Sequence, residues 1–216
     1  YGLSVFQTEY SMLSGGEGVP DNLDESTFLA NALFLAKIIY SDMEHTQVTS
    51  WSYWTAFGID LWNHKNRFLL ISVVPGGGSH GSMKSSVTAE ATKNLWALGN
   101  YSYVIRPGYQ RISTQNATDM GGLMCTSFIA PDSSRIVSVY VNMAATDQKI
   151  TADFQNLTGV TPVTNKRYVT DAFNDLKKYG SASSETYQEG KVLSIPSRSV
   201  TTIVYDLKKN NTSGIN

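Results

Sequence analysis

Apolar positions in the first half of the chain follow two spacings in turn. Residues 3–8 form a short apolar run, and between residues 29 and 40 apolar side chains recur at intervals of three and four. The first pattern predicts a buried strand and the second an amphipathic helix. Further strands are expected over residues 48–57 and 68–74, and a second helix over 88–99. Alternating strands and helices predict βα units, in which the strands pair in parallel.

The second half of the chain has short alternating segments separated by turn residues. The expected strands cover residues 124–129, 135–143, 149–154, 166–171, 192–195 and 199–206. Six strands at this spacing predict an antiparallel β-sandwich. The change of texture places a domain boundary near 106–108. We therefore expect a βα domain over 1–110, a sandwich over 111–207 and a loose polar tail over 208–216.

The bulk composition narrows the class of partner. The 216 residues are 41% hydrophobic and 16% charged, which is enough for one large domain or two small ones. A formal net charge of -1 gives no long-range field that would attract nucleic acid or an anionic membrane. Twelve Tyr and four Trp with so few charges favour a neutral, polar partner such as an uncharged sugar.

The sequence contains no recognisable targeting or membrane-spanning segment. No run approaches the roughly 18 to 20 apolar residues that cross a bilayer, and residues 1–6 lack the basic start of a signal peptide. The chain opens on an apolar run without a Met, although natural termini are usually polar and frayed. We interpret it as a chain cut within a larger protein, with no membrane span.

Cysteine and histidine give no pattern for a disulfide or a metal site. Cys125 is the single cysteine and lies in an apolar run, so we expect it to be buried. His45, His64 and His80 share no metal-ligand spacing, and the Gly-rich segment 75–82 lacks the Lys-Ser/Thr ending of a phosphate-binding loop. We therefore expect neither a metal nor a cofactor. Glycosylation sequons begin at Asn100, Asn116, Asn156 and Asn211.

Glu9 is the first candidate for chemistry, because it directly follows the apolar run at 3–8. In a barrel of βα units the carboxyl ends of the strands form the catalytic face. A carboxylate held there between aromatic neighbours suits the nucleophile of a glycosidase. The alternative is a Glu that caps the following turn, and position alone leaves both open.

Three aromatic residues close the next expected strand, in the segment Trp51-Ser52-Tyr53-Trp54. The apolar faces of sugars stack on such rings, whereas core packing is the alternative role. A separation of three residues puts Trp51 and Trp54 on opposite faces of a regular strand. We assign Trp54 to the site and Trp51 to its edge.

Several segments resemble, in order and spacing, the end of glycoside hydrolase family 30: Phe6–Ser11, Ala32–Tyr40, Ser50–Ala56, Leu95–Ser102 and Ile105–Gly108, with Ile195–Thr202 similar to the closing strand. That family includes endo-β-1,6-galactanases, β-1,6-glucanases, glucuronoxylanases and glucocerebrosidases. Its members have a (β/α)8 TIM barrel fused to a side β-sandwich. The resemblance implies an α/β part containing barrel strands 7 and 8, followed by an all-β part, the antiparallel β-sandwich.

The resemblance also implies roles for residues. Glu9 matches the family's strand-seven nucleophile, and Trp54 matches a strand-eight tryptophan that lines the sugar subsite. Trp51, Tyr53 and Tyr10 are expected to orient hydroxyls or extend the cleft. The family's acid/base, the Glu of an Asn-Glu pair on strand four, would lie before the first residue.

The implied activity is retaining hydrolysis of a β-linked oligo- or polysaccharide without a cofactor. The context of Glu9 is most similar to the β-1,6-galactanases. The upstream barrel half of the same protein is the implied partner, and the implied location is secreted, periplasmic or at the cell surface. The rival hypothesis is a non-catalytic carbohydrate-binding or structural β-sandwich module. The absence of any Trp after Trp96 argues against it, because sugar-binding sandwiches usually expose an aromatic row.

Overall fold

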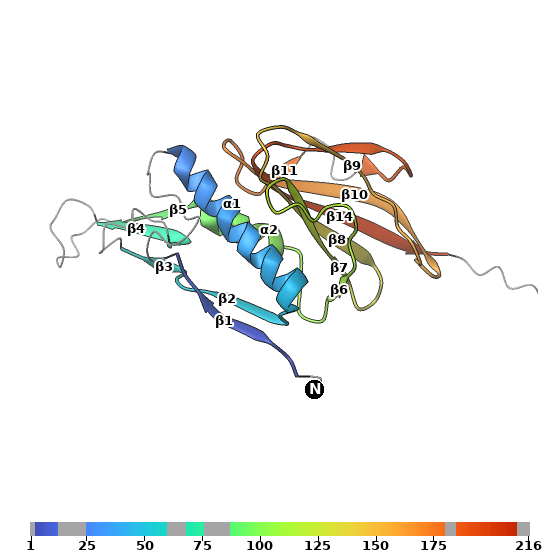
Figure 1. Ribbon diagram of the computed structural model, residues 1–216, viewed down its shortest axis with the longest axis horizontal. Coiled ribbons are helices and arrows are strands. Elements are labelled where there is room, and N and C mark those ends of the chain that lie inside the picture. The colour runs from blue at the N-terminus through green and yellow to red at the C-terminus, as the bar shows by residue number, and fades with distance from the viewer. Residues whose placement is uncertain (1–2, 13–24, 60–67, 76–86, 180–184, 211–216) are drawn as a thin grey trace, which may run out of the picture. The chain divides into compact units, whose positions relative to one another are not determined.

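A computed structural model describes residues 3–12, 25–59, 68–75, 87–179 and 185–210. They form two compact units, Tyr1–Gly99 and Asn100–Asn216, and most of their elements are labelled in Figure 1. The division falls inside helix α2 (Lys93–Ser102), so the domain boundary expected after residue 110 stays a prediction. His64, His80 and nearly all of the Gly-rich segment lie outside the described residues.

The first unit contains the expected βα unit. Strand β1 (Phe6–Tyr10) pairs in parallel with β2 (Ser50–Tyr53). Helix α1 (Glu25–Ser41) and the π-helical turn η1 (Asp42–Thr46) connect them. The apolar stripe of α1 is buried as its spacing predicts, with Leu33, Ala36 and Tyr40 at most 1% exposed.

A three-stranded sheet follows in the same unit. Its strands are β3 (Phe57–Gly58), β4 (Ile71–Pro75) and β5 (Val87–Ala91). β4 pairs in parallel with β3 and antiparallel with β5. The helix expected over 88–99 is therefore wrong at its start, and α2 begins only at Lys93. The chain changes from strand to helix at Thr92. Its hydroxyl donates to Leu69 O at 2.7 Å, and its carbonyl accepts from Leu95 N–H at 3.1 Å at the start of the helix.

The second unit is built on a seven-stranded antiparallel sheet, in the order β11-β10-β14-β8-β7-β6 with β12 paired to β10. A separate antiparallel pair joins β9 and β13. The strands of the unit are β6 (Gln110–Ile112), β7 (Leu123–Ile129), β8 (Arg135–Asn142), β9 (Gln148–Thr151), β10 (Val160–Thr170), β11 (Lys177–Tyr179), β12 (Glu185–Thr186), β13 (Val192–Ile195) and β14 (Ser199–Lys209).

All six strands expected in this half are present, and β6, β11 and β12 are additional. The tail expected to start at residue 208 was placed too early. β14 continues to Lys209, where it pairs with Val160 of β10. A polar sequence can extend a strand when the neighbouring backbone offers hydrogen bonds, and composition alone does not reveal that partner.

The core of the second unit lies between the large sheet and the β9–β13 pair. It is formed by Ala117, Cys125, Ile136, Tyr140, Leu193, Ile195, Ile203 and Tyr205. Burial raises the pKa of the phenols of Tyr140 and Tyr205 well above the ordinary value, so both stay neutral. Cys125 is 1% exposed, which confirms the expectation for the single cysteine.

Side-chain amides hold the edges of this core together. Asn142 is fully buried and donates to Thr146 O, Ile195 O and Pro196 O at 3.0, 3.3 and 2.9 Å. Its Oδ1 accepts from Ala144 N–H at 3.0 Å. The loops before β9 and after β13 are therefore fixed by one residue.

Asn100, the first residue of the second unit, is also fully buried. Its Nδ2 donates to Thr170 Oγ1 at 2.7 Å, and its Oδ1 accepts from Thr202 Oγ1 at 2.9 Å. The amide thus links β10 and β14 from the end of α2. The asparagine of the first glycosylation sequon is therefore a buried residue that helps to hold the fold together.

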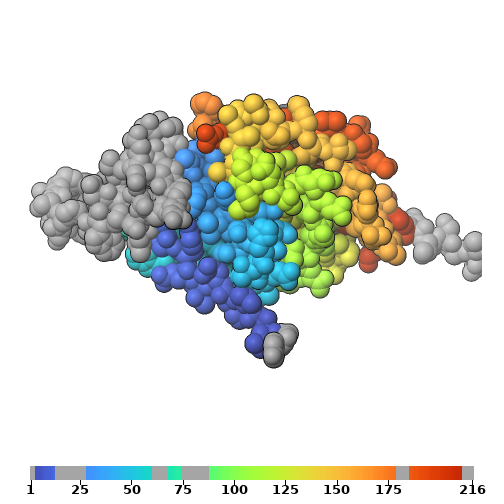
Figure 2. All heavy atoms as spheres, in the orientation of Figure 1, coloured from blue at the N-terminus to red at the C-terminus, as the bar shows by residue number. Residues whose placement is uncertain are grey.

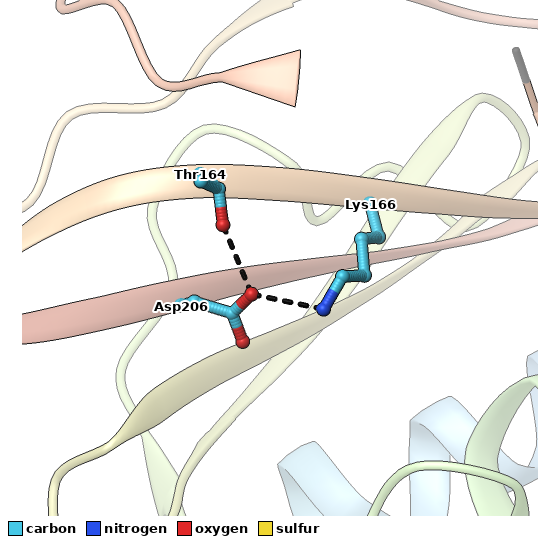
Figure 3. A network of polar contacts seen from close by, with 3 residues as sticks. All are labelled: Thr164, Lys166 and Asp206. Atoms are coloured by element: carbon cyan, nitrogen blue, oxygen red, sulfur yellow. Dashed lines mark hydrogen bonds and ion pairs between the residues drawn. The ribbon is translucent and has the colours of Figure 1, made fainter. Parts of the chain in front are cut away.

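An ion pair on the large sheet links β10 with β14 (Figure 3). The Asp206 carboxylate accepts from Lys166 Nζ at 3.0 Å and from Thr164 Oγ1 at 2.9 Å. Partial burial by itself would raise the pKa of Asp206, but these two hydrogen bonds and the Lys166 charge outweigh it and hold the pKa below its ordinary value.

Candidate active site

The carboxyl ends of β1 and β2 lie next to each other. The backbone N–H of Trp54 donates to Tyr10 O at 3.0 Å, one residue beyond the end of β2. Glu9 immediately precedes Tyr10 in β1. Parallel pairing therefore brings Glu9 and Trp54, 45 positions apart in the sequence, to the same end of the two-stranded sheet.

Glu9 lies inside β1, one residue before its end, and not directly after it as expected. Its side chain is exposed, as are those of Phe6 and Thr8, whereas Gln7 and Tyr10 are partly buried. The register of β1 against β2 is irregular between Gln7 and Tyr10, because two residues of β1, Thr8 and Glu9, lie opposite a single residue of β2. Figure 2 shows this N-terminal segment, in blue, at the surface.

Tyr10, Trp51 and Tyr53 form one aromatic cluster. The rings of Trp51 and Tyr53 stack, with centroids 6.1 Å apart and an interplanar angle of 15°. Tyr10 lies 5.9 Å from Trp51 and 6.5 Å from Tyr53. Burial, followed by the neighbouring Tyr10, raises the pKa of Tyr53 well above its ordinary value, and burial likewise raises the pKa of Tyr10. Both phenols therefore stay neutral at neutral pH, and the buried Tyr53 hydroxyl has no hydrogen-bond partner in the described part of the chain.

Trp54 has other neighbours. Its ring stacks on Phe68, with centroids 5.4 Å apart at 14°, and Phe68 is 1% exposed. The Trp54–Thr55 peptide bond is cis. Thr55 then donates to Phe68 O and accepts from Leu70 N–H, at 3.3 and 3.2 Å. One side of the Trp54 ring is thus backed by a buried phenyl ring, while the residue itself remains partly exposed.

Asp42, the first residue of η1, was not among the expected site residues. Its Oδ2 accepts from Trp51 Nε1 at 2.8 Å and from Gln7 Nε2 at 3.5 Å. The carboxylate therefore touches both strands that carry the candidate site. The only sequence signal was an acidic residue at the expected end of the helix, where it is unfavourable for the helix dipole.

Phe57 was also missed. It is 68% exposed and lies three residues after Trp54, so its Cα is within about 10 Å of that of Trp54. Its backbone is fixed by pairing with Ile71 of β4. A fixed backbone with an exposed phenyl ring three residues from Trp54 suits stacking on a sugar face.

The described residues contain no group of three or more His, Cys, Asp or Glu side chains able to hold a metal ion. In the same part of the chain no helix is long and apolar enough to cross a membrane. The chemistry available at this end of the sheet is one accessible carboxylate, neutral phenols and indole rings. Such a set can act on an electrophilic carbon of a neutral, ring-shaped ligand.

No protein-family model matches this sequence. Solved structures do. A conserved exported protein from Bacteroides fragilis is 26% identical, with a TM-score of 0.77 over 94% of this chain and 39% of that chain. The catalytic domain of a GH30 xylanase C from Talaromyces cellulolyticus is 24% identical, with a TM-score of 0.65 over 95% of this chain and 41% of that chain.

A GH30 endoxylanase from Clostridium papyrosolvens is 18% identical, with a TM-score of 0.63 over 95% of this chain and 42% of that chain. The chain thus spans about two fifths of the length of these proteins. The expected likeness to family 30 is confirmed at the level of the fold. The chain has the fold of a part of glycoside hydrolase family 30 enzymes.

Proposed function

We propose that this chain carries the nucleophile of a retaining β-glycoside hydrolase, and that the nucleophile is Glu9. The observation that carries the proposal is that Tyr10, the residue after Glu9, pairs with Trp54 at the carboxyl ends of two parallel strands. The Glu9 side chain is exposed, and the Trp54 ring has a rigid backing in Phe68. The family-30 fold supports the same assignment.

The reaction would proceed by two displacements. A carboxylate oxygen of Glu9 attacks the anomeric carbon, and the bond to the leaving oxygen breaks as a second carboxyl group protonates that oxygen. Water, deprotonated by that second group, then attacks the anomeric carbon and releases Glu9. Two inversions give net retention. A separation of about 5 to 5.5 Å between the two carboxyl groups is the geometry for this course.

The second carboxyl group is proposed to come from the upstream part of a (β/α)8 barrel, in which β1 and β2 are strands 7 and 8. Among the described residues β1 pairs with β2 alone. Leu3, Val5 and Phe6 are 83, 44 and 59% exposed. An apolar strand with an open edge is suited to receiving a further parallel strand. The second unit is proposed to be the side β-sandwich.

The proposed substrate is a β-linked oligo- or polysaccharide. β-1,6-Galactan is the first candidate because of the sequence around Glu9, and xylan is the second because of the similar enzymes. An uncharged glycan agrees with the net charge of -1 and with the aromatic surroundings of the site. The similar exported protein supports a secreted, periplasmic or cell-surface location.

The decisive experiment is trapping of the covalent intermediate in the complete protein, meaning this chain with the barrel segment proposed to precede it. An activated 2-deoxy-2-fluoro glycoside should add one sugar to the peptide containing Glu9, detected by mass spectrometry. Proton NMR of the first product should show the retained anomer. A label on another carboxylate, or an inverted first product, would refute the role of Glu9. Glycan binding without hydrolysis would favour the non-catalytic module.

A further inference from the structure

One carboxylate oxygen joins both strands of the β1–β2 pair. Asp42 Oδ2 accepts from Trp51 Nε1 at 2.8 Å and is 3.5 Å from Gln7 Nε2. Gln7 and Trp51 are themselves register partners in the parallel pair. Asp42, which lies outside the two-stranded sheet, therefore contacts the side chains of two residues that pair with each other across the strands.

The position of Asp42 is fixed by its own backbone. Its carbonyl oxygen accepts from the N–H of Gln47, which caps η1 in the left-handed region at φ 55°, and from Val48 N–H at 3.2 Å. These bonds close the π-helical turn and lead the chain into β2. A π-helical turn places its residues differently from an α-helical one and is often found near functional sites.

The indole that Asp42 holds lies against the candidate site. Trp51 contacts the ring of Tyr10, which follows Glu9 and whose carbonyl accepts from Trp54 N–H. The geometry points to Asp42 as a positioning residue, which sets β1 against β2 through Trp51 and Gln7 and thereby sets Glu9 relative to Trp54. Its catalytic consequence rests on the function proposed above, whereas the contact itself does not.

Positioning has a characteristic kinetic effect. A small displacement of a nucleophile lowers the rate of the chemical step much more than it lowers binding. In the complete protein Asp42→Ala is expected to lower kcat by about 10- to 100-fold while KM changes by less than about threefold. Asp42→Asn keeps a carbonyl oxygen that can accept from the indole, and should recover most of the loss.

The test combines these two variants with Trp51→Phe and the Asp42→Ala/Trp51→Phe double variant. Phenylalanine keeps a ring but removes the N–H donor. If Asp42 acts through Trp51, the double variant should have a kcat within about threefold of the slower single variant. Fluorine NMR of protein labelled with 5-fluorotryptophan gives an independent readout. Asp42→Ala should move the resonance that Trp51→Phe removes.

Asp206→Ala is the matched control, because Asp206 is another partly exposed, hydrogen-bonded carboxylate but lies in the second unit. It should lower stability and leave kcat and KM within about twofold. A melting temperature lowered by Asp42→Ala with unchanged kcat, multiplicative effects in the double variant, or an unmoved resonance would each overturn the proposal. A parent protein that hydrolyses no glycan would refute the proposed function, while the resonance would still decide whether Asp42 holds Trp51.

Discussion

The backbone N–H of Trp54 donates a hydrogen bond of 3.0 Å to the carbonyl oxygen of Tyr10. This bond extends the parallel β1–β2 pairing by one step beyond the end of β2. It is a main-chain contact, so side-chain substitutions at Glu9 and Trp54 leave it in place. The activity of variants at these positions can therefore be measured while the two strands remain paired.

Glu9→Gln should abolish turnover in the complete protein while the fold is retained. An amide cannot form the glycosyl ester, and losing a covalent nucleophile costs orders of magnitude in kcat. Glu90→Gln is the matched control, because Glu90 is also an exposed strand glutamate of the first unit. Steady-state rates with circular dichroism check both variants. Activity of Glu9→Gln within about tenfold of the parent would contradict its role.

Trp54→Ala and Trp51→Ala should differ in their effect on KM. Trp54→Ala removes the partly exposed stacking ring, so KM should rise and kcat should fall, and stability should fall as well because the buried Phe68 loses the ring that packs on it. Trp51→Ala removes a ring packed on Tyr10 and Tyr53 and should lower the free energy of unfolding by about 2 to 4 kcal/mol. Its kcat should fall with little change in KM. Thermal melts and steady-state kinetics test the pair, and an unchanged KM for folded Trp54→Ala would exclude its subsite role.

Asn142→Ala should destabilise the second unit by about 1 to 3 kcal/mol, because buried carbonyl groups lose their donor. Gln148→Ala is the control. Gln148 Nε2 approaches Thr146 O, which Asn142 also contacts, but at 3.5 Å in an exposed setting. That substitution should cost less than about 0.5 kcal/mol. Urea denaturation of both variants provides the comparison, and equal losses would show that Asn142 does not fix the two loops.

Acid should remove the contribution of the Asp206–Lys166 ion pair to the free energy of unfolding. The pKa of Asp206 is lowered in the folded protein, so the pair stabilises the fold above the ordinary carboxyl pKa of 3.8. This stabilisation is lost as the pH falls through the lowered folded value. Asp206→Asn should be about 0.5 to 1 kcal/mol less stable than the parent at pH 7, and the difference should shrink as the pH falls below 3.8. A difference independent of pH, measured by urea unfolding, would contradict this account.

The strands of the second half and the first helix could be predicted because their burial follows the apolar spacing. The run at residues 3–8 was expected to be a buried strand, but Leu3, Val5 and Phe6 are exposed, so only its strand character is confirmed. Helix α1 buries the stripe that its sequence shows, and each of the six strands expected in the second half is present. Residues 88–91, expected to be helical, belong to β5 because their strand character depends on pairing with β4. Short β6, β11 and β12 likewise exist through their neighbours and not through their own composition.

The candidate site was predictable where it depends on strand ends and not where it depends on distant contacts. Position after an apolar run identified Glu9 and the cluster at 51–54. The bond from Trp51 to Asp42 needed the structure, because the turn geometry of η1 decides where that carboxylate lies. Whether the side chain of Phe57 is exposed depends on how β3 pairs, which periodicity cannot reveal.

The buried amide of Asn100 has a practical consequence for producing the protein in a eukaryotic secretory host. Oligosaccharide transfer takes place on the emerging chain, and a glycan on this nitrogen would occupy the place of Thr170 and remove a hydrogen bond of 2.7 Å. Part of the product would then fail to fold. Ser102→Ala abolishes the acceptor motif at an exposed position. It leaves the Asn100 amide and its contacts to β10 and β14 intact.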